Sequence, residues 1–192
     1  LSADPPDKAG LAIASKHLAL LNEEGKALYR IKAAKAAVKS GRDKEAAAEL
    51  AKYLREIPQR RFKEEFLALT AWLAAGNHLK VITDLSDVLD KAFMLDARDF
   101  NHLGDLMMKS GKAAPAAHFY AKYREKMPTS FDPAIKAARA KLATGDTAGA
   151  AAAFREAGKY GQLSRGDIVT LAQALVGAKK FDEAHAFLDA EL

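Results

Sequence analysis

The chain has 192 residues, of which 49% are hydrophobic and 29% charged, a balance typical of folded proteins and unlike that of disordered ones. It contains no cysteine, which excludes disulfides and thiolate metal sites. No apolar run approaches the roughly 20 residues that a transmembrane helix needs, and the first residues lack the pattern of a signal peptide. Thirty basic against 25 acidic residues give a formal charge of +5, which mildly favours anionic partners.

The sequence begins without a methionine, so we expect a processed protein or a fragment of a longer one. The absence of cysteine suits a bacterial periplasm, and we favour a periplasmic over a cytoplasmic location. A cytosolic protein can also lack cysteine.

Helices are expected along the whole chain, because alanine runs are frequent and β-branched residues form no alternating pattern. The stretch from Asp7 to Leu21 predicts one helix, interpreted as the second half of a repeat. Four glycines then follow at intervals of 35, 35 and 34 residues, namely Gly41, Gly76, Gly111 and Gly145. Each follows one helical pattern and precedes another, which indicates a helix end closed in the left-handed conformation.

Alignment on these glycines divides the chain into a partial unit at 1–26, repeats at 27–60, 61–96, 97–130 and 131–164, and an incomplete unit at 165–192. The clearest repeat, 97–130, carries Phe100, Leu103 and Gly104 in its first helix, then Tyr120 and a final Pro128. This pattern resembles the tetratricopeptide repeat (TPR).

Small residues recur where the two helices of each unit should cross, and larger ones where each unit should meet the next. The small residues are Ala34, Gly104, Ala138 and Ala172 in first helices and Ala46, Ala116, Ala150 and Ala184 in second helices; the larger ones are Leu50, Tyr120, Phe154 and Leu188. Pro58 and Pro128 should end second helices. The middle unit departs from the pattern, with Val81 in place of the small alanine, and predicts a slightly longer, irregular repeat. An ordinary helical bundle is the alternative, but a bundle has no reason to keep a 34-residue period.

The resemblance implies an all-α fold, a TPR-like α-solenoid of antiparallel helix pairs forming a right-handed superhelix over residues 1–192. In that family the first helices line a concave groove. Among the charged residues at the corresponding positions here, eight are basic and two acidic, which predicts a basic groove. The residues expected to bind a partner are Lys32, Lys35, Lys39, Lys63, Phe66, Arg98, Asn101, His102, Lys109, Lys136 and Arg139.

Motifs for catalysis are missing from the sequence. The five histidines form no His-Glu-x-x-His pair, and no phosphate-binding loop, dinucleotide fingerprint or nucleophile elbow occurs. We therefore expect no enzyme, no cofactor and no metal site.

Three hypotheses for function remain open. The first is a protein-interaction scaffold that holds an acidic, extended partner segment; its narrower form is the periplasmic TPR segment of a bacterial exopolysaccharide export or assembly protein. The second is a module that binds a polyanion, either an acidic polysaccharide or nucleic acid. The third is the regulatory arm of a larger enzyme. A carboxylate clamp of the kind found in chaperone co-factors is not expected, since Asp105 would repel the carboxylate.

Overall fold

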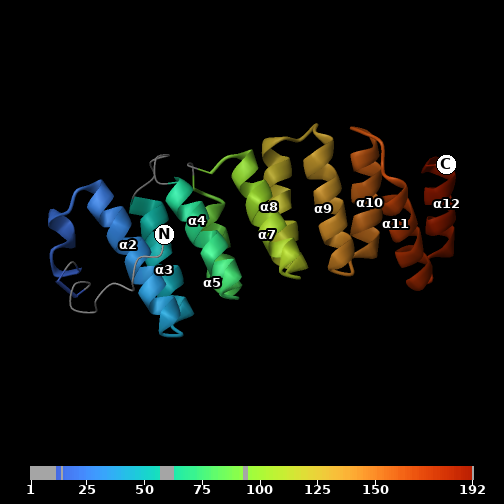
Figure 1. The fold of residues 1–192 in the computed structure, drawn as a ribbon. Helices are drawn as coiled ribbons and strands as arrows, with labels where there is room; N and C mark the ends of the chain where they lie inside the picture. The colour runs from blue at the N-terminus through green and yellow to red at the C-terminus, as the bar shows by residue number, and fades with distance from the viewer. Residues whose placement is uncertain (1–11, 14, 57–62, 93–94, 192) are drawn as a thin grey trace. The chain divides into compact units, whose positions relative to one another are not determined.

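The computed structural model describes residues 12–13, 15–56, 63–92 and 95–191. These residues form eleven α-helices and one short 3-10 helix, with no strand among them (Figure 1). The chain divides into two compact units, unit 1 at residues 1–95 and unit 2 at residues 96–192. None of the described helices is both long and apolar enough to span a bilayer.

Unit 1 contains one regular helix pair and one irregular pair. Its elements are η1 (Leu18–Leu20), α2 (Glu23–Lys39), α3 (Asp43–Glu56), α4 (Lys63–Ala75), α5 (Leu79–Thr83) and α6 (Ser86–Leu89). Of the helix predicted over 7–21, residues 12–13 and 15–16 are helical and Leu18–Leu20 form the 3-10 turn, while residues 7–11 and 14 lie outside the described part.

The predicted irregularity of the middle unit is confirmed in its second half. Two short helices, α5 and α6, stand where the other pairs have one long helix, and α3 packs against both. Leu85, in the break between them, is only 1% exposed, and Ile82 and Leu89 on either side are fully buried. The break is therefore part of the core of unit 1.

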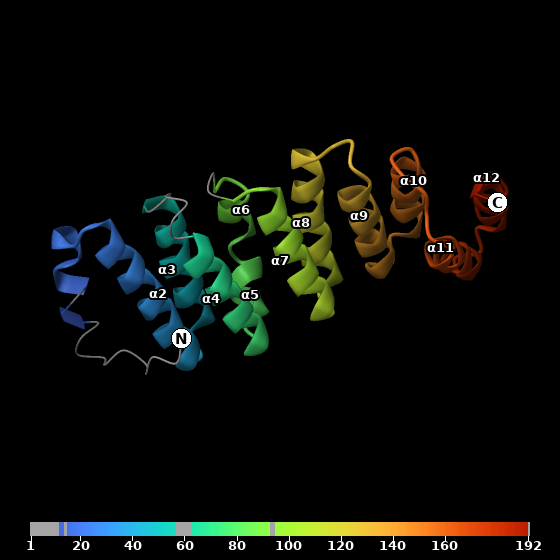
Figure 2. The ribbon, with the colours of Figure 1, turned by 45° about the horizontal axis from the view of Figure 1, so that its top comes forward.

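Unit 2 is a regular series of helix pairs. Its helices are α7 (Ala97–Lys109), α8 (Ala113–Lys126), α9 (Phe131–Ala143), α10 (Thr147–Gly158), α11 (Arg165–Gly177) and α12 (Phe181–Glu191). Each first helix packs on its own second helix, and α8 and α10 also pack on the first helix of the following pair (Figure 2). The first helices α7, α9 and α11 begin at the first residues of the predicted repeats.

One residue in the left-handed conformation follows each first helix, and its position in the sequence shows where the predicted repeat register was wrong. Gly41, Gly111 and Gly145 have positive φ angles of 69°, 70° and 82°, as expected, but Asn77 and not Gly76 takes this conformation in the middle unit, with φ 61°. Lys179 holds the equivalent position in the last pair, with φ 58°. The true intervals are 36, 34, 34 and 34 residues, so the predicted register of α4 was wrong by one residue.

This one-residue correction changes which side chains of α4 are expected to be buried and which exposed. Phe66, predicted to contact a partner, is fully buried and stacks on Tyr53 with ring centroids 6.0 Å apart. Thr70, 1% exposed, lies at the helix-crossing position held elsewhere by Ala34, Gly104, Ala138 and Ala172. Since a partner cannot reach a fully buried ring, the prediction that Phe66 binds a partner is wrong.

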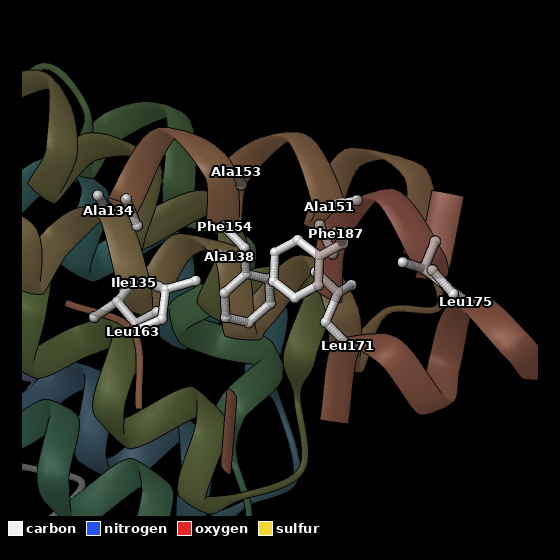
Figure 3. Close-up of a cluster of buried hydrophobic side chains, with 13 residues drawn as sticks. Ala134, Ile135, Ala138, Ala151, Ala153, Phe154, Leu163, Leu171, Leu175 and Phe187 are labelled. Atoms are coloured by element: carbon white, nitrogen blue, oxygen red, sulfur yellow. The ribbon is translucent and has the colours of Figure 1, made fainter. Parts of the chain in front are cut away.

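The predicted small positions are buried throughout the described pairs, including Ala46, Ala116, Ala150 and Ala184. Leu188 was expected to fill the space at the end of the last pair, but it is only half-buried, and the neighbouring Phe187 is fully buried in its place. Figure 3 shows Phe154 and Phe187 in the middle of the unit 2 core, among side chains from α9, α10, α11 and α12. Of the two predicted helix-ending prolines, Pro128 follows the end of α8 at Lys126, and Pro58 lies outside the described residues.

Candidate functional site

Each unit has a first-helix face, the surface formed by the exposed side chains of its own first helices: α2 and α4 in unit 1, and α7, α9 and α11 in unit 2. In unit 1 it carries exposed Lys32 and Lys39 on α2. The ammonium of Lys35 lies 5.8 Å from the centroid of the Trp72 ring, a cation–π contact that joins α2 to α4. Lys63 is half-buried at the start of α4, and the corrected register places it outside the expected groove positions.

In unit 2 the face is crossed by ion pairs between neighbouring first helices. The Lys136 ammonium of α9 donates to Asn101 Oδ1 of α7 at 2.6 Å and to Asp105 Oδ1 at 3.1 Å. Asp132, one turn before Lys136 on α9, lies 3.7 Å from the same ammonium. The structure thus brings together two predicted partner-binding residues, Lys136 and Asn101, but Lys136 binds Asn101 and two carboxylates of the chain itself.

Two tyrosines of α8 hold these carboxylates in place. The Tyr120 hydroxyl donates to Asp105 at 2.7 Å, and the Tyr123 hydroxyl donates to Asp132 at 3.1 Å. Burial raises the pKa of Tyr120 well above its ordinary value, and the bond to Asp105 raises it further. The pKa of Tyr123 is raised by burial and by its bond to Asp132, so both hydroxyls stay protonated and act as donors.

A second ion pair joins α9 to α11. Arg139 donates from Nε to Asp167 Oδ1 at 2.7 Å and from Nη2 to Asp167 Oδ2 at 2.8 Å, the bidentate geometry of a strong charge-assisted contact. Ser164, the N-cap of α11, donates to Asp167 Oδ2 at 2.5 Å. The Asp167 side chain is 8% exposed and that of Arg139 is 50% exposed. The hydrogen bonds from Arg139 lower the pKa of Asp167, despite its partial burial.

This pKa shift predicts a pH-dependent contribution to stability. A carboxylate whose folded-state pKa is depressed stabilises the fold above its unfolded-state pKa, near 3.8, and loses this contribution as the pH falls through the folded-state value. We expect Asp167→Asn to lower the free energy of unfolding at pH 7 by about 1–3 kcal/mol. The difference from wild type should shrink below about pH 4, as thermal melts between about pH 3 and pH 7 would show.

The same exchange at the exposed Asp182 of α12 is the control, with an expected change below about 0.5 kcal/mol. Equal effects of the two substitutions, or a difference at Asp167 that stays constant down to about pH 3, would contradict the role assigned to the Arg139 pair.

A pocket of about 430 Å³ opens beside this ion pair. Arg139, Leu142 and Ala143 of α9 line one wall, Asp167 and Thr170 of α11 line the other, and Phe154 of α10 lies at the bottom. Of the lining residues, Arg139 is among those expected to bind a partner. The lining is largely apolar and not basic.

The first helices carry fewer unpaired basic side chains than the sequence predicted for the groove. Lys136 and Arg139 are both paired with carboxylates, and the corrected register adds Glu64 to the groove positions of α4. Among the predicted cations, four are exposed and form no ion pair with any described residue: Lys32, Lys39, Arg98 and Lys109. His102 is also exposed.

Arg30 is a buried charged residue that the sequence pattern did not identify. It is 6% exposed and donates to Glu49 of α3 at 2.8 Å and to both carboxylate oxygens of Glu56, at 3.1 and 2.8 Å. It occupies the repeat position held by Phe66 and Phe100 in other units, and a charged residue at a core position is the signal that could have found it. Its partners tie α2 to α3, so its role is structural.

The part of the chain that the structure describes holds no group of three or more His, Asp or Glu side chains placed to bind a metal ion. A comparison with protein-family models finds no match for this chain. A comparison with curated protein sequences also finds none.

Proposed function

We propose that the chain is a protein-interaction scaffold of TPR-like helix pairs, in which the first-helix face of a unit holds an extended segment of a partner protein. The observation that carries this proposal is that four of the predicted partner-binding cations are exposed and form no ion pair with a described residue: Lys32 and Lys39 on α2 in unit 1, and Arg98 and Lys109 on α7 in unit 2. Each pair lies on one side of its helix, at a spacing of seven or eleven residues, close to two or three helical turns.

The partner segment should carry acidic side chains. Lys35 is held against Trp72, and Lys136 and Arg139 are bound to carboxylates of the chain, so these three cations serve mainly to join neighbouring helices. The four unpaired cations remain available to a ligand at little cost, because no existing ion pair has to be broken. Exposed Leu28, on the same side of α2, offers apolar contact beside them.

The narrower prediction of a periplasmic segment of an exopolysaccharide export protein rests on family analogy, and so do the right-handed superhelix and the single array over 1–192. These stay predictions, and binding at the first-helix face does not require them.

Charge reversal tests the proposal. A partner protein is captured with the chain, and its dissociation constant is then measured for Lys32→Glu/Lys39→Glu and for Arg98→Glu/Lys109→Glu. Each double variant should weaken binding by about three- to tenfold or more, since every reversal replaces an attraction with a repulsion of similar size.

The matched control makes the same charge change on second helices, with Lys44→Glu on α3 and Arg155→Glu on α10, both exposed. Affinities equal to wild type in both first-helix variants, or equal losses in the control, would remove the first-helix face as the binding surface. Titration with heparin and with a single-stranded oligonucleotide at two salt concentrations tests the polyanion alternative, because such binding weakens steeply with salt.

A further inference from the structure

The pocket between α9 and α11 offers a different chemistry from the exposed cations. Leu142 and Ala143 form one side and the Phe154 ring lies at its floor, so its interior is apolar. Its volume of about 430 Å³ is within the range of about 300–1,000 Å³ that is usual for ligand pockets, which is sufficient for one large side chain and the backbone beside it.

The charges at its rim cancel each other. Arg139 and Asp167 are in bidentate contact, so beyond a few ångströms they act as a neutral pair and exert little pull on an anionic ligand. Asp167 accepts two hydrogen bonds from Arg139 and one from Ser164, so most of its acceptor sites are occupied. The rim therefore favours an uncharged group over an acidic one.

Arg139, which lines the pocket, keeps several N–H groups open. Arg139 uses Nε and Nη2 for Asp167, and the described residues give its Nη1 no hydrogen-bond partner. The bidentate contact fixes the plane of the guanidinium, so the N–H groups of Nη1 are oriented donors on a residue that lines the pocket. A backbone carbonyl of a bound segment is a suitable acceptor, because it carries no net charge.

We propose that this pocket takes one apolar side chain of an extended partner segment, whose backbone carbonyl accepts a hydrogen bond from Arg139 Nη1. The inference rests on the proposed scaffold function and specifies its ligand in unit 2. It assigns the acidic part of the segment to Arg98 and Lys109 of α7, in the same unit, and an apolar anchor to the pocket. Binding of the anchor is insensitive to salt.

The test selects random linear peptides from a display library on the full chain and measures each selected peptide by fluorescence anisotropy. Replacing the apolar anchor of a peptide with serine should weaken binding by about 10- to 100-fold, the loss that corresponds to burying one large apolar side chain. Ala143→Trp, which fills the pocket from an exposed position, should weaken binding by about tenfold or more. Thr170→Phe on the opposite wall is the second filling variant, used if the first loses helicity by circular dichroism.

Ala152→Trp, at an exposed position of α10 outside the pocket lining, is the control and should change affinity by less than about twofold. Failure to select any peptide, or full binding to both filling variants, overturns the pocket assignment. Peptides that bind the filled variants but not Arg98→Glu/Lys109→Glu would preserve the scaffold proposal and refute the pocket alone. Loss of binding only in the filled variants would support the pocket and count against the cations.

Discussion

Tyr120→Ala should lower the free energy of unfolding by about 3–5 kcal/mol, the range for removing an aromatic side chain from a packed core. Tyr120 is 4% exposed and lies between α7 and α9, where its ring packs against Gly104 and its hydroxyl holds Asp105. The substitution removes the ring and the hydrogen bond together. Urea denaturation followed by far-UV circular dichroism would measure the loss.

Two further variants separate the effect of losing the buried ring from the effect of losing the hydrogen bond to Asp105. Tyr120→Phe keeps the ring and loses only the bond to Asp105, so it should cost about 1.5–3 kcal/mol at most. Phe181→Ala removes an aromatic ring that is 61% exposed and should cost less than about 1 kcal/mol. A Tyr120→Ala variant as stable as Phe181→Ala would show that α8 does not pack between α7 and α9 as described.

Gly104→Leu should destabilise unit 2 by about 1–3 kcal/mol, and by more if the helices cannot separate. A Cβ atom at Gly104 would overlap Tyr120 Cε1 and would lie 2.5 Å from Tyr120 Cδ1, far inside van der Waals contact. The ring cannot easily move away, because its hydroxyl is fixed by Asp105 and its faces are buried. Even Gly104→Ala should destabilise, although alanine normally stabilises a helix relative to glycine by about 1 kcal/mol. Urea denaturation of each variant would measure these changes.

Gly177→Ala provides the matched comparison at the end of α11. A Cβ atom there would have no neighbour within 4 Å, and the glycine does not have a positive φ. This substitution should be neutral or stabilise by about 0.4–1 kcal/mol. Effects of the same sign at both glycines would contradict the close approach of α7 and α8. Combining Gly104→Ala with Tyr120→Leu should cost less than the sum of the two, since the smaller side chain relieves the overlap.

Local sequence signals were sufficient for the helices of unit 2. Asp96 and Ser164 cap helices where their side chains can accept backbone hydrogen bonds, and Gly111 and Gly145 adopt the left-handed conformation that ends a helix. In unit 2 the 34-residue spacing and the residues at the helix ends indicate the same boundaries, so the predicted starts of the first helices coincide with the observed ones. The same signals failed for α4. The repeats were aligned on Gly76, but the adjacent Asn77 takes the left-handed conformation, which asparagine also tolerates.

The candidate site was harder to predict, because ion pairs depend on distances between helices. Sequence positions placed Lys136 and Arg139 on the first-helix face but gave no means of finding their partners. Asp167 lies 28 residues from Arg139 and belongs to a repeat position not expected to face a ligand. The predicted basic groove therefore overestimated the free positive charge of unit 2 and missed the apolar pocket beside the ion pair.

That the chain is helical, that its helices pair, and that small residues such as Gly104 and Ala138 lie where they cross could all be read from the order of the amino acids. These properties follow from helix propensity, caps and a repeated pattern of side-chain sizes, which act over one or two helical turns or over one repeat. The packed structure was needed to establish which cations are paired, that Phe66 is buried, and that an apolar pocket opens between α9 and α11. Burial and charge pairing depend on the side chains that neighbouring helices bring within a few ångströms, and a shift of one residue along a helix, about 100°, is enough to turn a surface residue into a core residue.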